Sequence, residues 1–307
     1  MSAINVDEVD GEVVKNLINS VDTVLFDIDG VLVIQNQIVP GAAEFIEKLR
    51  NIGKKIAYVT NNTLKSPETI KQILAPIKAE LDEINNPITA LLEYLQRIDY
   101  KKDIYVIGSR ACKKLLTDAG FNVIDYKSLR IRDLEEDLNA IRELSRKAIE
   151  RCQNVGMVFL DYDINFCQGA IQVAQVILSN IANVQLASGC LDDWGNIGSN
   201  IILSGPKYYG DALERWSKKK TIGFGKPGQG LVNLICNKLN ITDGQRVLMI
   251  GDSLYSDIAF GVAGGFKTCL ILSSDLPKQE LATAKRTNKF IPDYVTESVG
   301  NLYKKLK

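Results

Sequence analysis

Short apolar segments of strand length, each ending in polar residues, recur along this 307-residue chain. Residues 24–26, 56–59 and 247–250 are the clearest examples. Segments with helical periodicity separate them, and this alternation continues over most of the chain. An alternation of strands and helices is typical of α/β proteins with a largely parallel sheet. The sequence therefore predicts an α/β fold whose polar strand ends are candidates for a functional site.

Aspartates cluster at two of these strand ends. Asp27 and Asp29 follow the first segment, and Asp252 and Asp257 follow the last one. In an open parallel sheet, ligands bind just beyond the carboxyl ends of the strands, so neighbouring strands would bring these carboxylates together. Two unit charges roughly 4 Å apart repel by about 4 kcal/mol at an effective dielectric of about 20. Because such a cluster needs a cation, the sequence predicts a Mg²⁺ site.

The spacing of the first aspartate pair indicates a particular chemistry. Side chains alternate between the two faces of a strand, so Asp27 and Asp29 are expected to point to the same side. Gly30 permits a sharp turn that brings backbone N–H groups close to an anion. One carboxylate can attack phosphorus while the other exchanges a proton with the leaving oxygen. The alternative is an ordinary turn with two solvated aspartates.

Side chains suited to holding phosphate follow two other predicted strands. Thr60 and Asn61 come after residues 56–59 and offer a hydroxyl, an amide and backbone N–H groups. Lys226 follows a predicted strand at residues 221–224 and precedes a helix. Its compact cation suits a phosphate oxygen. Taken together, these strand ends supply a nucleophile, a proton donor, phosphate ligands and metal carboxylates.

A dinucleotide-binding site is a competing interpretation of the glycines around Lys226. Residues 223–228 match the GxGxxG pattern, and Asp243 lies at about the distance expected of a ribose-binding acid. However, Asp243 precedes its predicted strand, whereas the ribose-binding acid should follow one. Pro227 also replaces a residue that would normally donate a backbone hydrogen bond. The pattern therefore favours phosphate binding over dinucleotide binding.

Composition excludes several classes of function. The chain has 37 basic and 37 acidic residues, so its net charge gives no reason to expect nucleic acid or an anionic membrane as a partner. It has no histidine, which excludes histidine-based catalytic triads and histidine-ligated metals. Its six cysteines form no CxxC pair, so a zinc site finds no support. Proton transfer must therefore depend on carboxylates, lysine, tyrosine or water.

The apolar segments are also too short for a membrane protein. None approaches the roughly 18 residues that a membrane-spanning helix needs. Residues 1–11 are acidic and lack the basic-then-apolar order of a signal peptide. We therefore expect a cytoplasmic protein whose partner is a small molecule.

The four polar segments together resemble the haloacid dehalogenase-like superfamily of aspartate-nucleophile phosphatases. The resemblance is closer to the branch that contains p-nitrophenyl phosphatases, phosphoglycolate phosphatases and pyridoxal phosphatases. Its most specific matches are residues 27–32, 60–66, 225–227 and 251–257. The resemblance covers nearly the whole chain, and it implies a Mg²⁺-dependent phosphomonoester hydrolase that forms an aspartyl-phosphate intermediate.

The resemblance also implies a role for each matched residue. Asp27 would be the nucleophile and Asp29 the general acid and base. The phosphoryl group would be held by Thr60, Asn61 and Lys226.

The metal ligands implied by the resemblance overlap with the catalytic aspartates. Mg²⁺ would be bound by Asp27, the backbone carbonyl of Asp29, and Asp252. Asp257 would lie in or near the layer of residues that contact these ligands and not the ion itself.

A discontinuous domain organisation follows from the same resemblance. Residues 1–84 and 205–307 would form a Rossmann-like core, and residues 85–204 an inserted α/β cap that selects the substrate. The branch also suggests a homodimer formed through the cap. Residues 159–163 and 186–194 depart from the cap motifs of relatives, so the resemblance leaves the substrate open. A pyridoxal phosphate phosphatase, a phosphomutase and a non-catalytic scaffold that retains the fold stay as alternatives.

Overall fold

The computed structural model describes all of the chain except residues 1–2, 131, 133–136, 191, 197–201 and 288. It contains two compact units, and the chain crosses between them several times. The first unit comprises Met1–Thr60, Pro67–Asn86 and Lys226–Lys307, and the second comprises Asn61–Ser66 and Pro87–Gly225. None of the helices in the described part of the chain has the length and apolar character that a bilayer-spanning segment requires.

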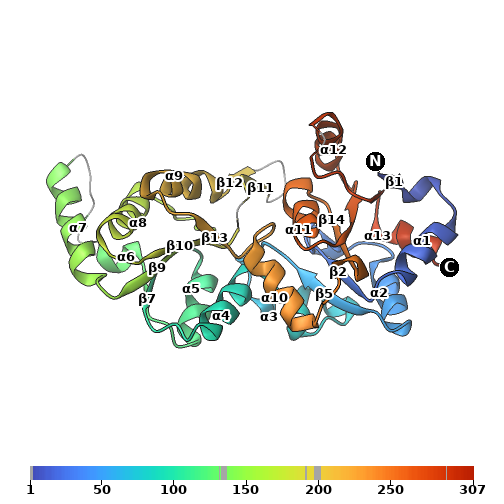
Figure 1. Ribbon diagram of the computed structural model, residues 1–307, viewed down its shortest axis with the longest axis horizontal. Coiled ribbons are helices and arrows are strands. Elements are labelled where there is room, and N and C mark those ends of the chain that lie inside the picture. The colour runs from blue at the N-terminus through green and yellow to red at the C-terminus, as the bar shows by residue number, and fades with distance from the viewer. Residues whose placement is uncertain (1–2, 131, 133–136, 191, 197–201, 288) are drawn as a thin grey trace. The chain divides into compact units, whose positions relative to one another are not determined.

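A seven-stranded sheet forms the centre of the first unit (Figure 1). All of its neighbouring strands are parallel. In spatial order the strands are β1 (Ile4–Asn5), β16 (Tyr294–Thr296), β15 (Lys267–Ile271), β14 (Val247–Gly251), β2 (Thr23–Phe26), β5 (Lys55–Val59) and β6 (Ile84–Asn85). The predicted α/β fold with a parallel sheet is therefore confirmed.

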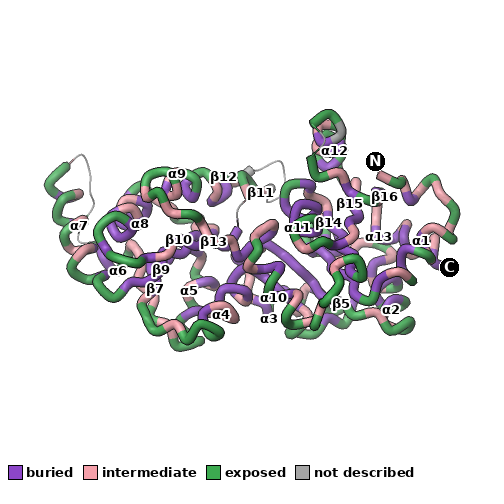
Figure 2. Tube along the Cα trace, viewed as in Figure 1, coloured by how far each residue is buried: buried purple, intermediate pink, exposed green. Residues whose placement is uncertain are grey.

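The strands that carry the predicted site lie side by side in this sheet. β2 lies between β14 and β5, with Phe26 opposite Ile250 on one side and Tyr58 on the other. All residues of β2 and β14 are buried, and Figure 2 shows these strands in purple. Strands buried on both faces are expected to be largely apolar, and these strands are apolar apart from the buried Thr23 of β2. The carboxyl ends of β14, β2 and β5 consequently meet at one edge of the sheet.

Helices surround this sheet and bury their apolar faces. In α1 (Gly11–Asn19), the Asp10 side chain caps the first turn by accepting a hydrogen bond from the Glu12 N–H, and the helix buries Val14, Leu17 and Ile18. The Phe45 ring on α2 (Ala42–Asn51) packs edge-on against Phe26 of β2. The other elements of the unit are the hairpin β3 (Val33–Ile34) and β4 (Gln37–Ile38), and helices α2 (Ala42–Asn51), α3 (Pro67–Ile73), α10 (Gln229–Leu239), α11 (Ala259–Ala263), α12 (Asp275–Thr287) and α13 (Val299–Lys305).

The second unit has a parallel sheet of its own, with five strands. In spatial order they are β13 (Thr221–Gly223), β10 (Gln185–Ser188), β9 (Val155–Leu160), β7 (Asp103–Ile107) and β8 (Val123–Ile124). The remaining elements are α4 (Pro87–Arg97), α5 (Arg110–Asp118), α6 (Tyr126–Leu129), α7 (Leu138–Arg151), α8 (Gln168–Asn180), α9 (Lys207–Ser217), and the hairpin β11 (Trp194–Asn196) with β12 (Ile202–Ser204).

The boundaries of the second unit differ from the predicted residues 85–204. Residues 205–225 belong to this unit because β13 pairs with β10, with Thr221 opposite Leu186. The short segment Asn61–Ser66 also belongs to it, although this segment follows β5 of the first unit. That the second unit acts as a substrate-selecting cap stays a prediction.

A fully buried carboxyl group lies at the end of β9. Asp161 accepts hydrogen bonds from the Thr63 hydroxyl at 2.8 Å and from the Tyr162 N–H at 2.7 Å. Burial raises the pKa of Asp161 to about 7. The charge of Asp192 acts in the same direction, whereas the two hydrogen bonds oppose the shift. Besides Asp192, the titratable groups near Asp161 include the thiols of Cys112 and Cys190 and the phenols of Tyr162 and Tyr209.

We predict that Asp161→Asn changes the pH dependence of stability. Because the pKa is raised, folding favours the protonated carboxyl, so this contribution is complete below about pH 4 and is lost as the pH rises to about 7. The amide of the variant does not titrate, so its stability relative to the wild type should rise by on the order of a few kcal/mol from about pH 4.5 to about pH 8. Urea unfolding of both proteins across this range measures the difference. A difference that stays constant with pH would contradict the raised pKa.

Candidate active site

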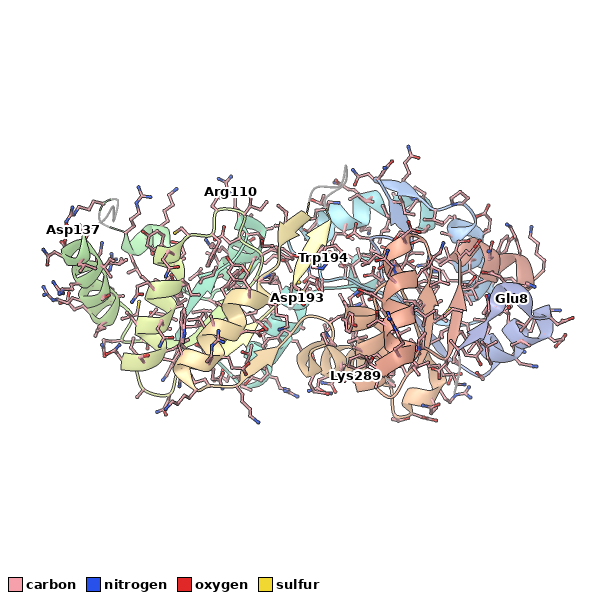
Figure 3. The ribbon with its side chains drawn as sticks, turned by 90° about the horizontal axis from the view of Figure 1, so that it is seen from above. Glu8, Arg110, Asp137, Asp193, Trp194 and Lys289 are labelled. Carbon is pink, nitrogen blue, oxygen red and sulfur yellow. The ribbon has the colours of Figure 1, made fainter. Side chains whose placement is uncertain are left out.

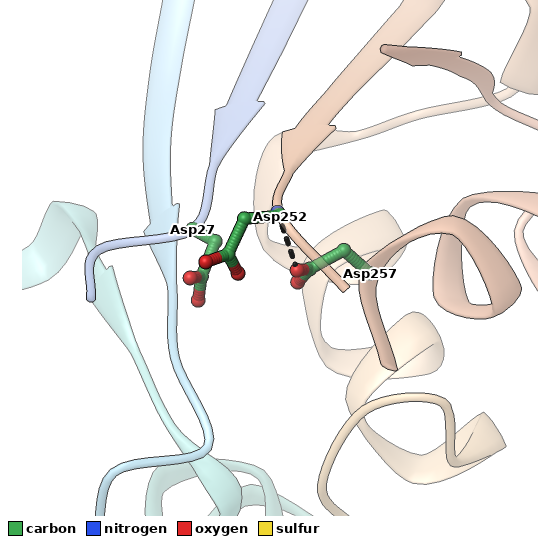
Figure 4. A group of neighbouring side chains, drawn as sticks. All are labelled: Asp27, Asp252 and Asp257. Carbon is green, nitrogen blue, oxygen red and sulfur yellow. Dashed lines mark hydrogen bonds between the residues drawn. The ribbon is translucent and has the colours of Figure 1, made fainter. Parts of the chain in front are cut away.

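Three carboxylates converge at the carboxyl ends of β2 and β14. One oxygen each of Asp27, Asp252 and Asp257 lies within 4.8 Å of the others (Figure 4). Asp27 directly follows β2, Asp252 directly follows β14, and Asp257 belongs to the short π-helical turn Leu254–Ile258. Asp27 and Asp257 are buried, and Asp252 is half-buried. Three of the four aspartates that were predicted to converge therefore do so, and Asp29 does not belong to the group.

A fully buried lysine lies among these carboxylates. The Nζ atom of Lys226 donates to Oδ1 of Asp27, to Oδ1 of Asp257 at 2.6 Å and to the Val59 carbonyl oxygen at 2.9 Å. A buried ammonium group is tolerated only when it is paired and its protons are hydrogen-bonded, and these contacts meet that requirement. The structure thus brings the predicted phosphate-binding Lys226 and the predicted nucleophile Asp27 into direct contact.

The cluster has more negative than positive charge. Burial raises the pKa of Asp27 well above its usual value, with Lys226 opposing this shift and the carboxylates of Asp257 and Asp252 adding to it. Burial and the charge of Asp257 raise the pKa of Asp252 to about 7. Burial alone would lower the pKa of Lys226, but the charges of Asp257 and Asp27 outweigh it and raise this pKa. The group therefore needs further positive charge to keep its carboxylates ionised.

A divalent cation fits this donor set. Mg²⁺ prefers oxygen ligands and is usually bound by one or two carboxylates together with water and phosphate oxygens. Asp27 and Asp252 end neighbouring strands and offer carboxylate oxygens to one point. These two residues would hold the ion, which would supply positive charge for the phosphate of a substrate.

Asp257 already has several hydrogen-bond donors. Its Oδ2 atom accepts from the backbone N–H groups of Asp252 and Ser253, both at 3.0 Å, and its Oδ1 atom accepts from Lys226. These contacts hold the loop after β14 in shape and orient Asp252. They support the predicted place of Asp257 behind the metal ligands, which stays a prediction.

Two glycines allow the loops to approach this closely. Gly30 has φ +89°, and a Cβ atom there would lie 2.0 Å from Oδ2 of Asp252. A Cβ atom on Gly251 would lie 2.1 Å from the Cβ atom of Asp257. Both distances are too short for any side chain, so these positions require glycine. The sequence predicts a role for Gly30 alone, as an aid to anion binding.

The structure does not gather all the predicted residues. Asp29 is exposed, and its side chain lies outside the carboxylate cluster. Thr60 is buried at the end of β5, where its N–H donates to the Asn85 carbonyl oxygen at 3.0 Å. Asn61 belongs to the second unit, where its Nδ2 atom donates to the carboxylate of Asp192 at 3.2 and 3.3 Å. The functional roles of these three residues stay predictions.

Sequence reasoning missed one further acid beside the site. Glu280 on α12 accepts a hydrogen bond from the Leu254 N–H at 3.0 Å, in the turn that carries Asp257. Its charge contributes to the raised pKa of Asp252. Glu280 lies in a charged helix with no motif around it, so no local signal could have identified it.

Comparison with protein families agrees with this site. A family model described as Haloacid dehalogenase-like hydrolase matches residues 24–122, and a second one, described as HAD-hydrolase-like, matches residues 223–302. The first range contains Asp27 and Thr60, and the second contains Lys226 and Asp252. The two matches thus include both halves of the geometric site.

Individual relatives extend over nearly the whole chain. Phosphoglycolate phosphatase 2 of Arabidopsis thaliana is 28% identical over 94% of this chain and 95% of its own length. Human chronophin is 26% identical over 95% of each chain. Among solved structures, the 4-nitrophenylphosphatase of Thermotoga maritima has a TM-score of 0.75 at 20% identity, covering 95% of this chain and 99% of its own. With the family models and the clustered carboxylates, these similarities lead to one conclusion: the chain belongs to the haloacid dehalogenase-like hydrolases.

Proposed function

We propose that this chain is a Mg²⁺-dependent phosphomonoester hydrolase that acts through an aspartyl-phosphate on Asp27. The observation that carries the proposal is the pairing of the Asp27 carboxylate with Lys226, within 4.8 Å of a carboxylate oxygen of Asp252. A nucleophile, a fixed cation and a cation-binding carboxylate are the groups that phosphoryl transfer needs. The relatives named as phosphatases support the same reaction.

Each residue has a defined part in the proposed mechanism. A carboxylate oxygen of Asp27 attacks phosphorus, the bond between phosphorus and the leaving oxygen breaks, and Asp29 donates a proton to that oxygen. Asp29 then takes a proton from water, whose oxygen attacks phosphorus, so that phosphate leaves and the Asp27 carboxylate is restored. Lys226 balances charge throughout, and the bound Mg²⁺ would neutralise charge on the phosphoryl oxygens.

The burial pattern suits this division of labour. Asp27 is buried beside a fixed cation, so its environment changes little during the reaction. Asp29 is exposed, so it can exchange protons with water between the two half-reactions. Two aspartates separated by one residue therefore have the different environments that a nucleophile and an acid/base require.

The substrate that we propose is a small phosphorylated metabolite. The relatives named above include a phosphoglycolate phosphatase and a 4-nitrophenylphosphatase. Their substrates, phosphoglycolate and 4-nitrophenyl phosphate, are therefore candidate substrates for this chain. Rates across a panel that includes phosphoglycolate, glycerol 3-phosphate, pyridoxal phosphate and sugar phosphates would identify the preferred leaving group. Homodimerisation through the second unit and a cytoplasmic location stay predictions.

We predict that Asp27→Asn removes phosphatase activity. An amide is a poor nucleophile, so hydrolysis of p-nitrophenyl phosphate in the presence of Mg²⁺ should fall by about a thousandfold or more. Asp243→Asn provides a matched control, since Asp243 is exposed and caps a short turn by accepting from the Gln245 N–H. Retained activity in Asp27→Asn would remove Asp27 as the nucleophile.

Asp252→Asn should weaken Mg²⁺ binding. The variant keeps the shape of the side chain but loses a charged oxygen ligand, so the Mg²⁺ concentration for half-maximal activity should rise by about tenfold or more. Isothermal titration with Mg²⁺ measures the same change without substrate. Equal Mg²⁺ affinity in variant and wild type would show that Asp252 is not a ligand.

Lys226→Met should lower both stability and rate. It leaves the carboxylates of Asp27 and Asp257 buried without their cation, which costs about 3–5 kcal/mol of unfolding free energy. Urea unfolding measures this cost. The exposed Lys55, which donates to the Leu239 carbonyl oxygen, gives a control variant Lys55→Met that should change stability by less than about 0.5 kcal/mol. Equal losses in the two variants would contradict the importance of the buried pair.

A further inference from the structure

Three consecutive backbone N–H groups after β14 donate to carboxylates. The Asp252 N–H donates to Oδ2 of Asp257 at 3.0 Å, as Figure 4 shows, and the Ser253 N–H donates to the same atom at 3.0 Å. The Leu254 N–H donates to Oε2 of Glu280 at 3.0 Å. The first N–H groups of a helical turn have no partner within that turn, so other groups must accept from them. Glu280 is such an acceptor, and it comes from α12, 26 residues further along the chain.

The turn that Glu280 contacts has an uncommon shape. Leu254–Ile258 forms a single π-helical turn, in which the Ala259 N–H donates to the Leu254 carbonyl oxygen. Turns of this kind are rare, and they occur frequently at functional sites. Both polar backbone groups of Leu254 are therefore hydrogen-bonded, the N–H to Glu280 and the carbonyl oxygen to Ala259. Asp257 belongs to this turn, so the shape of the turn determines where its carboxylate lies.

Apolar packing holds α12 against the same turn. Leu281 of α12 belongs to one buried apolar cluster with Leu254 and Ile258 of the turn. The chain just beyond the helix is exposed, as at Lys289 (Figure 3). One side of α12 thus packs on the turn, and the half-buried Glu280 adjoins Leu281 on the helix. The acceptor of the Leu254 N–H is therefore carried by an element that is itself fixed to the turn.

Two effects of Glu280 reach Asp252. The first is a chain of hydrogen bonds, from Glu280 to the Leu254 N–H and, through the turn, from Asp257 to the Asp252 N–H. The second is the negative charge of Glu280, which acts on the carboxyl of Asp252. Because Glu280 is only half-buried, water and salt screen its charge, whereas its hydrogen bond to the backbone does not depend on distant charges. The hydrogen bond is therefore the stronger basis for a role at the site.

We propose that Glu280 is a positioning residue for the Mg²⁺ site, whose hydrogen bond to the Leu254 N–H holds the turn that keeps Asp252 and Asp257 in place. This inference rests on the proposed function, which makes Asp252 a metal ligand. Groups that orient metal ligands contribute to metal affinity, because a ligand that is already ordered loses little conformational freedom when the ion binds. Loss of the hydrogen bond therefore weakens Mg²⁺ binding, although Glu280 itself does not touch the ion.

The direct test compares Glu280→Leu with Glu280→Gln. Leucine is a good helix former that lacks a hydrogen-bond acceptor, whereas glutamine keeps an acceptor oxygen and lacks the charge. Isothermal titration with Mg²⁺, without substrate, measures the dissociation constant of each variant. Loss of one hydrogen bond corresponds to about a fivefold change in affinity, so this constant should rise by about fivefold in Glu280→Leu. In Glu280→Gln it should stay within about twofold of the wild-type value.

Two results of this titration overturn the proposal. If Glu280→Gln weakens Mg²⁺ binding as much as Glu280→Leu does, the charge of Glu280 explains the effect and the positioning role is wrong. Unchanged Mg²⁺ affinity in Glu280→Leu overturns it as well.

Ser20→Ala is the matched control, because it removes hydrogen bonds at the opposite end of the same sheet. The Ser20 hydroxyl donates to the Leu17 carbonyl oxygen at 2.7 Å and accepts from Nζ of Lys267 at 2.6 Å, beside the amino ends of β2 and β15. Urea unfolding should show a loss of stability in Ser20→Ala as in Glu280→Leu, whereas its Mg²⁺ affinity should equal that of the wild type. If Ser20→Ala weakens Mg²⁺ binding as much as Glu280→Leu does, general loosening of the first unit explains the effect and the proposal is overturned.

Hydrogen exchange without Mg²⁺ reports on the turn itself. The Leu254 amide should exchange faster in Glu280→Leu than in the wild type, and at nearly the wild-type rate in Glu280→Gln. Unchanged exchange in Glu280→Leu, in an enzyme that hydrolyses phosphomonoesters normally, rejects this inference alone.

The same measurements separate this inference from the proposed function. A wild-type protein that binds Mg²⁺ but hydrolyses no phosphomonoester rejects the proposed function alone, since the Mg²⁺ affinities of the two variants still decide the role of Glu280. A wild-type protein that binds no Mg²⁺ rejects the proposed function and the positioning role together.

Discussion

The ammonium group of Lys226, buried between the carboxylates of Asp27 and Asp257, is the interaction on which the site depends. One cation cannot balance the charges of Asp27, Asp252 and Asp257, so the cluster keeps an excess of negative charge. That excess favours the binding of a divalent cation, and the bound cation would in turn favour the binding of a substrate's phosphate group. The same imbalance thus links the stability of the first unit to its proposed chemistry.

The parallel sheet explains why this charge cluster forms at all. β14, β2 and β5 are neighbours, so their carboxyl ends deliver Asp252, Asp27 and Thr60 to one edge. The absence of a side chain at Gly30 and Gly251 is also needed, because it leaves the space that the side chains of Asp252 and Asp257 occupy. Substrate selection needs different groups, and that the second unit supplies them stays a prediction.

Much of the first unit could be predicted from sequence, because the signals there are local. An apolar segment followed directly by Asp27 or Asp252 indicates both that the segment is a strand and where that strand ends. The membership of residues 205–225 could not be predicted, since it depends on β13 pairing with a strand some 35 residues earlier, as Thr221 does with Leu186. The contact of Asn61 with Asp192 joins residues 131 positions apart, and no motif marks either as a partner of the other.

The most direct test of the central claim is a crystal structure of the protein soaked in Mn²⁺, with the ion located by its anomalous scattering. Shared coordination predicts one strong peak about 2.1 Å from carboxylate oxygens of both Asp27 and Asp252, with Lys226 still paired to Asp27. No peak at this edge of the sheet, or a peak that contacts neither aspartate, would contradict the claim that these two strand ends bind one divalent ion.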